Sequence, residues 1–305
     1  MLSLFESSKL AVGLTALAAV ANAAHYEVAV GKGNKLTFEP ETLTTQLGDT
    51  VTYKFFSKFH SIAQSKFDDP CHLSEGGLFS GYVPTESSDV AAPTSFTITV
   101  NDTKPLWLYC STGEHCKAGM VHAINAPTNG TNTFDAYKSA AQKVSTAATP
   151  PVGTLPVGGI RKTHIDVGAS NGSIIFSPNN ITELVGTVLE FSYNPKNHSI
   201  VQSSFDKPCQ PLESGFAAPF VATKQAPSGV TFEVEVKDEK PIWFYCAQTL
   251  GSHCQAGMVG AVNAPTSGNN TFDAYLSAAA KAPTSVQPSF APLNGTLKVN
   301  ETIIY

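Results

Sequence analysis

Short segments in which apolar and polar residues alternate recur along this chain. Clear examples are residues 51–55 (VTYKF), 95–100 (SFTITV), 231–236 (TFEVEV) and 242–245 (IWFY). They are rich in β-branched and aromatic residues, and Pro, Gly, Asn and Asp separate them. Alternation with a period of two predicts strands that bury one face in a core. The pattern therefore indicates an all-β protein, built as a β-sandwich or a Greek-key barrel.

Two short helices are expected among these strands. Each begins after a threonine, Thr133 or Thr271, whose hydroxyl can cap the helix N-terminus. The aspartates that follow, Asp135 and Asp273, favour the positive end of the helix dipole. In the first helix three apolar residues fall on one face, namely Phe134, Tyr137 and Ala141. Each helix follows one complete run of strands.

The run of strands and its helix occur twice in the chain. A shift of more than a hundred residues carries His60 onto His198, and the same shift aligns the two helices. A repeat of this length means two whole domains, because solenoid units are far shorter. We predict domains at 24–157 and 160–305, each with a trailing helix, and a C-terminal tail on the second.

The connection between the two domains is expected to be short. Residues 145–159 resemble a flexible linker, but the sequence GTLPV at 153–157 recurs as GTLKV at 295–299, after the second helix. The repeated unit then includes this segment, which is predicted to be ordered and docked on its own domain. The joint is placed near Gly158-Gly159. A short joint favours a fixed arrangement of the two domains.

Length, charge and the chain ends narrow the classes of function. The chain has 305 residues and a formal net charge of −5, without a basic run, which disfavours nucleic acids and anionic membranes as partners. Residues 1–23 have the pattern of a secretory signal, with Lys9, an apolar run and a terminal Ala-Asn-Ala. No later run approaches the roughly 20 apolar residues of a membrane span. The final residues, ETIIY, lack the apolar tail of a GPI signal. We expect a secreted protein, extracellular or associated with the cell wall.

Asn-x-Ser/Thr sequons support this compartment. Seven are predicted as glycosylation sites: Asn101, Asn129, Asn171, Asn180, Asn269, Asn294 and Asn300. An eighth sequon, at Asn197, directly precedes His198, and we do not count it because buried loop backbone is expected there. Cysteines in such a compartment are expected to form disulfides, so a free thiol there needs a reason.

The candidate chemistry lies in two copies of one segment, 107–120 (WLYCSTGEHCKAGM) and 243–258 (WFYCAQTLGSHCQAGM). Two His, one Cys and a weak axial Met are the ligands of a blue-copper electron-transfer site. The predicted ligands are His60, Cys110, His115 and Met120 in the first copy, and His198, Cys246, His253 and Met258 in the second. The sequence therefore predicts one type 1 copper in each domain. Because six residues instead of four separate the second Cys from its His, we expect the second centre to be the weakened or retuned one.

The four other cysteines are placed to form disulfides. The predicted pairs are Cys71–Cys116 and Cys209–Cys254, which would brace each metal loop from outside and leave Cys110 and Cys246 free as thiolates. The alternative is three disulfides and no metal, with Cys110 joined to Cys246 across the domains. The duplicated ligand types beside both cysteines disfavour it.

The remaining histidines and the tryptophans are interpreted as structural. His164 is taken to correspond to His25, and neither is given a metal role. His72 and His122 have no histidine counterpart in the other copy and are expected at the surface. The two tryptophans, Trp107 and Trp243, are expected to pack in the core beside the ligand strand.

These residues resemble the cupredoxin family, and in particular its phytocyanin-like branch. The resemblance is carried by His60-Ser61-Ile62, by Asp69-Pro70-Cys71 and by residues 109–120, and it covers about residues 25–130 and 164–268. The tandem layout is similar to secreted fungal cupredoxin-domain proteins of the extracellular serine-rich type. The resemblance implies a Greek-key β-sandwich, type 1 copper and one-electron transfer.

The chain departs from the family pattern in two ways. Ser61 and Ser199 stand where many cupredoxins have Asn, so the bracing of the metal loop is expected to differ. The serine-rich tail and lipid-anchor signal of the fungal relatives are absent from this sequence.

The favoured function is therefore one-electron transfer by a secreted protein, with an unidentified redox partner such as an extracellular oxidase. An enzyme is the first rival, because cupredoxin domains also build multicopper oxidases. Those oxidases pass electrons through a histidine next to the thiolate cysteine, whereas here Tyr109 and Ser111 flank Cys110, and no His-x-His pair occurs. Copper sequestration, or a structural role in the cell wall with incidental copper binding, is the second rival.

Overall fold

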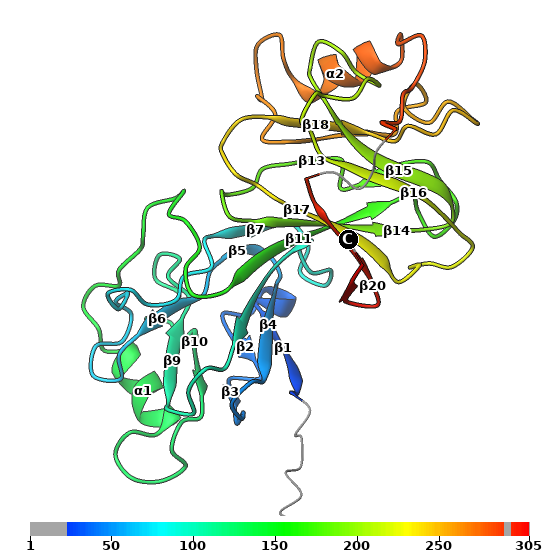
Figure 1. The fold of residues 1–305 in the computed structure, drawn as a ribbon. Coiled ribbons are helices and arrows are strands. Elements are labelled where there is room, and N and C mark those ends of the chain that lie inside the picture. Colours follow the sequence, from blue (N-terminus) through cyan, green and yellow to red (C-terminus); the bar gives the residue numbers. More distant parts are fainter. Residues whose placement is uncertain (1–22, 290–293, 305) are drawn as a thin grey trace, which may run out of the picture.

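The computed structural model describes residues 23–289 and 294–304. The predicted signal segment, residues 1–23, lies outside these ranges except for its last residue. Within them the chain is mostly β-structure with two short α-helices, arranged as two lobes with one helix each (Figure 1).

The first lobe contains the 3-10 helix η1 (Lys32–Asn34), the helix α1 (Phe134–Ala141) and the following strands. They are β1 (His25–Val30), β2 (Phe38–Glu39), β3 (Thr42–Leu43), β4 (Thr50–Phe55), β5 (Lys58–His60), β6 (Ala63–Ser65), β7 (Val83–Thr85), β8 (Thr94–Thr99), β9 (Leu106–Tyr109) and β10 (Val121–Ile124).

The second lobe follows the same order, except that β15 (Lys196–Ser203) takes the places of both β5 and β6 and that its described residues contain no 3-10 helix, and it ends in an additional hairpin. It contains the helix α2 (Phe272–Ala279) and the strands β11 (Ile160–Val167), β12 (Phe176–Ser177), β13 (Asn180–Ile181), β14 (Val188–Tyr193), β15 (Lys196–Ser203), β16 (Ala217–Thr223), β17 (Val230–Glu235), β18 (Ile242–Tyr245), β19 (Val259–Val262), β20 (Thr296–Val299) and β21 (Thr302–Ile303).

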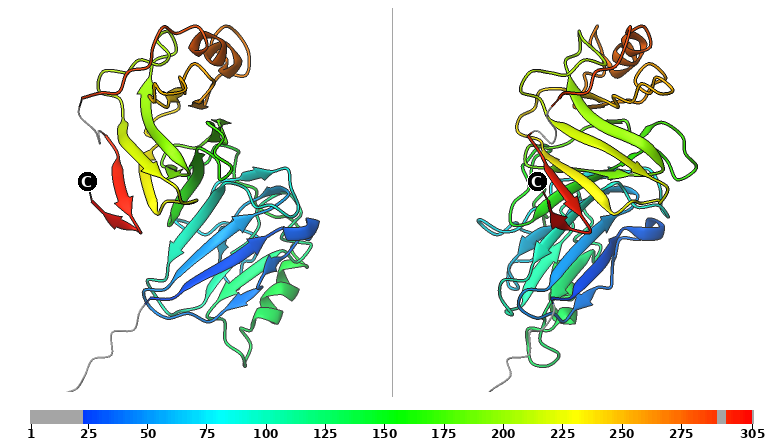
Figure 2. Two further views of the ribbon diagram at one scale, coloured as in Figure 1. Left: turned by 90° about the vertical axis from the view of Figure 1, so that its right-hand side faces the viewer. Right: turned by 45° about the vertical axis from the view of Figure 1, so that its right-hand side comes forward.

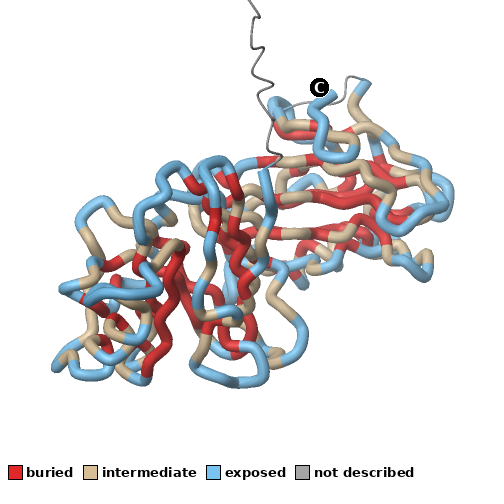
Figure 3. The backbone as a smooth tube through the Cα atoms, turned by 90° about the horizontal axis from the view of Figure 1, so that it is seen from below, coloured by how far each residue is buried: buried red, intermediate tan, exposed pale blue. Residues whose placement is uncertain are grey.

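Each lobe has an apolar core between strands of two sheets. In the first lobe, strands in the order β2-β1-β4-β8 and β3-β10-β9-β6 contribute to one cluster, which includes Tyr53, Phe96 and Leu108. In the second, Phe191 and Phe244 belong to the corresponding cluster. Figure 3 shows the buried residues following the strands in both lobes. Apolar residues at alternate strand positions thus build the core, as the period of two predicts.

Both helices begin where the sequence predicts. Thr133 and Thr271 each accept a hydrogen bond from the backbone N–H three residues later, at Ala136 and Ala274. Each helix covers the outer side of its ligand strand, and Trp107 contacts Tyr137 of α1 with ring centroids 4.8 Å apart. Trp243 makes the same contact with its own helix at the same distance. The tryptophans are core residues, as predicted.

The two lobes share one continuous sheet through β11. This strand pairs in parallel with β14 of its own lobe, and its first residues pair antiparallel with β8 of the other lobe. The sheet order is β2-β1-β4-β8-β11-β14-β17-β20-β21, and Figure 2 shows the strands passing from one lobe to the other. The lobes therefore have no free linker between them, and the predicted fixed arrangement agrees with this joint.

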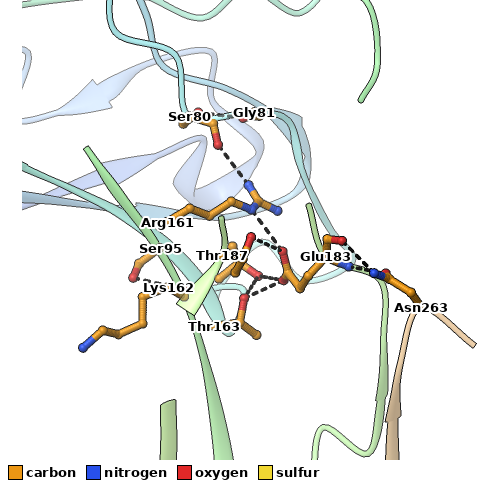
Figure 4. A network of polar contacts seen from close by, with 10 residues as sticks. Ser80, Gly81, Ser95, Arg161, Lys162, Thr163, Glu183, Thr187 and Asn263 are labelled. Carbon is orange, nitrogen blue, oxygen red and sulfur yellow. Dashed lines mark hydrogen bonds and ion pairs between the residues drawn. The ribbon is translucent and has the colours of Figure 1, made fainter. Parts of the chain in front are cut away.

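A buried ion pair stabilises the joint (Figure 4). Arg161 Nε donates to Glu183 at 3.0 Å, and both side chains are 3% exposed. Arg161 also donates to the carbonyl of Ser80 in the first lobe at 3.1 Å. The hydroxyl of Thr94, in β8, donates to the same carboxylate at 2.7 Å. Because every charged group here has partners, removing one of them would leave an uncompensated buried charge.

The sequence match between 153–157 and 295–299 does not correspond to the fold. Residue 157 of the first segment bridges to Phe79, so that segment is docked on the first lobe as expected. The second segment instead forms β20, which pairs with β17. The structural counterpart of β20 is the start of β11, because 160–163 pair with β8 in the register in which β20 pairs with β17. The shared pentapeptide therefore lies at non-equivalent places in the two lobes.

Two predictions about histidines are wrong. His25 pairs with Thr50 and Lys162 pairs with Val188, so the counterpart of His25 is Lys162 and not His164. His122, predicted at the surface, is 0% exposed. It packs between Phe38 and Tyr53 in the core, because α1 covers the outer face of β10 and both faces of that strand are buried.

Among the residues that the structure describes, no helix is long and apolar enough to cross a membrane.

Candidate metal centres

Three ligand types from separate elements meet in the first lobe. β5 ends at His60, β9 delivers Cys110, and the loop before β10 carries His115. The Cys110 sulfur lies 3.6 Å from Nδ1 of His60 and 3.5 Å from Nδ1 of His115. Metal bonds of about 2.3 Å to sulfur and 2.0 Å to nitrogen, about 120° apart, would separate such atoms by about 3.7 Å. The group therefore has the spacing of ligands around one metal ion.

The second lobe repeats the group. The Cys246 sulfur lies 3.9 Å from Nδ1 of His198 and 3.4 Å from Nδ1 of His253. In both groups the three ligand atoms lie within 4.8 Å of one another. The longer loop of the second copy thus keeps the ligand geometry, although it changes what covers it.

The methionines lie where each ligand loop closes. The N–H of Cys110 donates to the carbonyl of Met120, and the N–H of Met120 donates to the carbonyl of His115. Met258 makes the same two bonds in the second lobe. Both methionines are 0% exposed and belong to the same apolar cluster as the free cysteine of their lobe. The backbone therefore fixes Met, Cys and His of each loop relative to one another.

Hydrogen bonds orient the first histidine of each group. Nε2 of His60 lies 2.9 Å from the carbonyl of Ser57, and Nε2 of His198 lies 3.0 Å from the carbonyl of Pro195. A carbonyl only accepts, so Nε2 carries the proton and Nδ1 keeps a lone pair that points at the cysteine sulfur. A hydrogen bond from the other ring nitrogen to a carbonyl is typical of metal-ligating histidines.

Two glycines make room for these rings. A Cβ on Gly31 would lie 2.1 Å from Nε2 of His60, and a Cβ on Gly168 would lie 2.6 Å from Nε2 of His198. Both glycines also have a positive φ, of 80° and 82°. Sequence reasoning missed them, although both directly follow the first strand of their copy.

The serine after each first histidine braces the cysteine loop. Ser61 Oγ accepts from the N–H of Ser111 at 3.0 Å, and Ser199 Oγ accepts from the N–H of Ala247 at 3.0 Å. In this chain the bracing of the cysteine loop is thus a direct hydrogen bond to the serine hydroxyl. In the first lobe only, Ser111 Oγ continues the network to Ser61 Oγ at 2.8 Å and to Tyr82 at 3.3 Å.

The disulfides lie against the ligand loops. Cys71 is bonded to Cys116 and Cys209 to Cys254, while Cys110 and Cys246 are free and buried. Each bridge joins the residue directly after the second histidine to an upstream loop. Because Cys110 and Cys246 are both free thiols, the alternative of a third disulfide between them is excluded.

Burial controls protonation in both groups. It lowers the pKa of His60, His115 and His198, and it lowers the pKa of His253 to about 4. Burial also raises the pKa of the two free thiols. Neutral imidazoles can bind a metal directly, whereas a thiol must release its proton to the solvent when a metal binds.

The predicted glycosylation residues are all exposed, namely Asn101, Asn129, Asn171, Asn180, Asn269, Asn294 and Asn300. Asn294 Nδ2 donates to the carbonyl of Ser214 at 2.8 Å, so a glycan there would compete with this contact. The uncounted Asn197 is only partly exposed.

Comparison with known proteins identifies the family. The chain is 38% identical over 135 residues to a "Probable GPI-anchored cupredoxin-1" of Arthroderma benhamiae, a match that covers 44% of this chain and 68% of that protein. The chain belongs to the cupredoxin family. A second relative of this cupredoxin, an "Extracellular serine-rich protein" of the same fungus, is 34% identical over 145 residues, which are 47% of this chain and 55% of the relative.

No protein-family model matches this cupredoxin. Solved structures similar to it include a pseudoazurin from Sinorhizobium, with 24% identity, 40% of this chain and 93% of that chain covered, and a TM-score of 0.26. Plastocyanin from Dryopteris crassirhizoma has 22% identity, with 33% and 97% covered and a TM-score of 0.24.

Proposed function

We propose that this cupredoxin is an extracellular one-electron carrier with two type 1 copper centres. The first copper would be held by His60, Cys110, His115 and Met120, and the second by His198, Cys246, His253 and Met258. Each would lie in a Greek-key sandwich domain, spanning 24–157 and 160–305. A bound type 1 copper supplies the chemistry by cycling between Cu(II) and Cu(I).

One observation carries the proposal: in both lobes a buried free cysteine faces two imidazole Nδ1 atoms at 3.4–3.9 Å. The first histidine is held in the tautomer that leaves Nδ1 free. A structural histidine has no need of this arrangement, and its exact duplication with a thiol and a methionine favours a metal centre.

The chain's own residues would keep the ligands in place while the charge of the centre changes. The disulfides hold the second histidine from outside, and Ser61 and Ser199 hold the backbone after each cysteine. The buried surroundings exclude water from the thiolate. A ligand loop that moves little between two oxidation states supports fast electron transfer.

Two rival functions are less well supported. An oxidase would need a histidine beside the ligand cysteine to reach a second copper cluster, and Tyr109 and Ser111 occupy those positions. Among the described residues, only the two groups above gather three or more His, Cys, Asp or Glu ligand atoms. Copper sequestration, or a cell-wall role with incidental copper binding, would use the same ligands, and only redox measurements separate it from electron transfer.

An extracellular location is supported by two disulfides, which are typical of oxidising compartments, and by the word "Extracellular" in the name of one relative. Cleavage of the segment 1–23 and glycosylation of the exposed sequons belong to the same proposal. The partner would be a protein that exchanges single electrons, such as an extracellular oxidase.

Copper reconstitution tests the proposal. Purified protein is loaded with Cu(II), and metal content and the visible absorption spectrum are measured for the wild type, Cys110→Ser, Cys246→Ser and the double variant. We expect an intense thiolate-to-Cu(II) band that each single variant reduces and the double variant loses. A wild type that stays colourless with excess Cu(II) would refute the copper assignment. A coloured protein that ascorbate cannot reduce would favour sequestration.

A further inference from the structure

In the second lobe, β20 pairs with the edge of β17. This pairing resembles the joint between the lobes, where the start of β11 pairs with β8. β20 pairs with β17 at Leu297↔Phe232 and Lys298↔Thr231. The start of β11 pairs with β8 at Arg161↔Phe96 and Lys162↔Ser95. Since Phe96 and Phe232 occupy the same register position opposite β4 and β14, the two pairings are equivalent residue by residue.

Packing before the two strands agrees with this equivalence. A Cβ on Gly159 would lie 2.5 Å from the Phe96 ring, and a Cβ on Gly295 would lie 2.2 Å from the Phe232 ring. The next inward-facing residues, Arg161 and Leu297, are 3% and 4% exposed. The tail thus takes the place in the second lobe that the next domain's first strand takes in the first lobe.

The complementary edge lies at the other end of the chain, on β1. β1 corresponds to β11, and residues 23–26 correspond to 160–163. The main chain of Ala24 faces β4, since its carbonyl accepts from Thr50. His25 and Glu27 therefore direct their backbone groups to the opposite side. On that side of β1, no strand among the described residues pairs with it before Ala29, which pairs with Glu39 of β2.

We infer that the edge of β17 is an acceptor for a β-strand, that β20 is its internal occupant, and that displacing β20 opens the edge to β1 of a second copy of this chain. The interface would reproduce the β8–β11 joint between molecules. Because the two edges belong to different lobes, the contact is head-to-tail, so each added copy leaves a free edge for the next until a ring closes. Unpaired strand edges are templates for such association.

The intact chain is protected against this association in two ways. β20 fills the acceptor edge, and the hairpin to β21 ends the sheet. The charges of the internal joint are also missing from the intermolecular one. Ala24 and Thr45 stand where the second lobe has Arg161 and Glu183, so no buried ion pair would form. Tail displacement would therefore give a reversible assembly.

The first test removes the occupant. A chain ending before Asn294 and the full-length chain are compared by sedimentation velocity over a range of protein concentrations. We expect the truncated chain to form oligomers whose size grows with concentration, relative to the full-length chain. Leu297→Asp, which puts a charge at a buried position of β20, should act in the same direction, and Ile303→Asp, at a residue 65% exposed, should not.

The second test blocks the proposed partner edge. Glu27→Pro removes an N–H that points away from β4, so it spares the pairing of β1 with β4 while it prevents a strand from adding outside. In the truncated chain it should abolish the oligomers. A folded truncated chain that stays as monomeric as the full-length chain, or oligomers that ignore Glu27→Pro, would overturn the inference.

Failure of the truncated chain to fold is also informative. A synthetic peptide spanning 294–304 would then be added during refolding. Recovery of native circular dichroism at saturating peptide would support an acceptor edge, and no recovery would make β20 an inseparable part of the core and overturn the inference.

Discussion

The two candidate centres share their ligands but differ in what covers them. His115 is partly exposed at the end of its loop, whereas His253 is only 4% exposed. The second loop is two residues longer, and its Gly251 backbone lies against the His253 ring, with the glycine's Cβ position 3.6 Å from Cδ2. Leu250 beside it is 84% exposed. Strand ends and short hydrogen bonds thus hold the ligands in both lobes, and the lobe with the longer loop is the one whose second histidine is less exposed.

The inner side of the two centres differs as well. The first lobe extends its serine brace through Ser111 to Tyr82, whose hydroxyl donates to the carbonyl of Pro150 at 2.8 Å. In the second lobe Ala247 stands at the equivalent position and the network ends at Ser199. In the second centre the second histidine is therefore more shielded from solvent, and fewer polar side chains contact the backbone behind the cysteine.

The largest expected effect is the loss of copper from one centre while the other centre keeps its copper. Gly31→Ala would drive a methyl group into Nε2 of His60, and Gly168→Ala would do the same to His198. Each variant should halve the copper bound per chain, as measured by metal analysis and by the thiolate absorption. Gly33→Ala is the matched control, because that glycine also has a positive φ but no neighbour within 4 Å of its Cβ position. Full copper content in Gly31→Ala would contradict the role given to this glycine.

The second expected effect is a different dependence of stability on pH in the two lobes. Burial lowers the pKa of His122 to about 4, so between its unfolded value near 6.5 and pH 4 the unfolded chain binds a proton that the folded chain does not. The first lobe should lose stability as the pH falls through this window, by about 3 kcal/mol in total, and little more below it. In the second lobe the hydrogen bond to Glu190 raises the pKa of His164, which adds stability below pH 6.5 that is lost as the pH rises through the raised value.

Urea unfolding of the metal-free protein at pH 7 and pH 4.5 measures this difference. Wild type and His122→Leu are compared, because the ligand histidines also titrate and contribute equally to both proteins. We expect a smaller pH dependence in His122→Leu. Equal dependence in the two proteins would show that His122 does not act as a buried neutral group.

The sequence predicted the site better than it predicted the register. His60, Cys110 and His115 stand out because scarce residue types recur at matching offsets, and the structure brings them together. A strand pattern of period two, however, looks nearly the same after a shift of two residues. The sequence therefore predicts His164 as the counterpart of His25, whereas the pairing partners give Lys162. Register depends on strands far away in the chain, which a local pattern does not contain.

The burial of both faces of β10 could not be predicted from the sequence either. His122 lies in a strand of four residues, too short for its pattern to show which face is buried. Its neighbours Val121 and Ala123 pack in the cluster that contains Tyr137 of α1, and His122 points into the core between the sheets. The second copy fills this region differently, since Gly260 stands there and the Phe244 ring occupies the space where its Cβ would lie. Such a compensating exchange becomes visible only when both copies are superposed in space.

A smaller effect is expected on the rate at which a reagent from the solvent modifies the second histidine of each centre. In the metal-free protein, diethyl pyrocarbonate should modify His115 several-fold faster than His253, as followed by peptide mass spectrometry. Deleting Thr249 and Leu250 gives the second loop the length of the first and should raise the rate at His253 towards that at His115. Leu250→Ser keeps the loop length and should leave His253 slow. Equal rates at both histidines in the wild type would remove loop length as the cause of their different exposure.

The smallest effect tests the polar contacts behind the first centre. Ser111→Ala makes the first lobe resemble the second, where Ala247 stands, and it removes hydroxyl contacts while the N–H of residue 111 keeps its bond to Ser61. A neutral hydrogen bond contributes about 1 kcal/mol, so the free energy of unfolding of the metal-free protein should fall by no more than that, and copper binding should persist. Ser61→Ala should cost more, about 1–3 kcal/mol, because it leaves the buried N–H of residue 111 without a partner. If Ser111→Ala abolished copper binding while Ser61→Ala did not, the extended network would be essential to the first centre, and the second lobe, which lacks that network, could not hold copper in the same way.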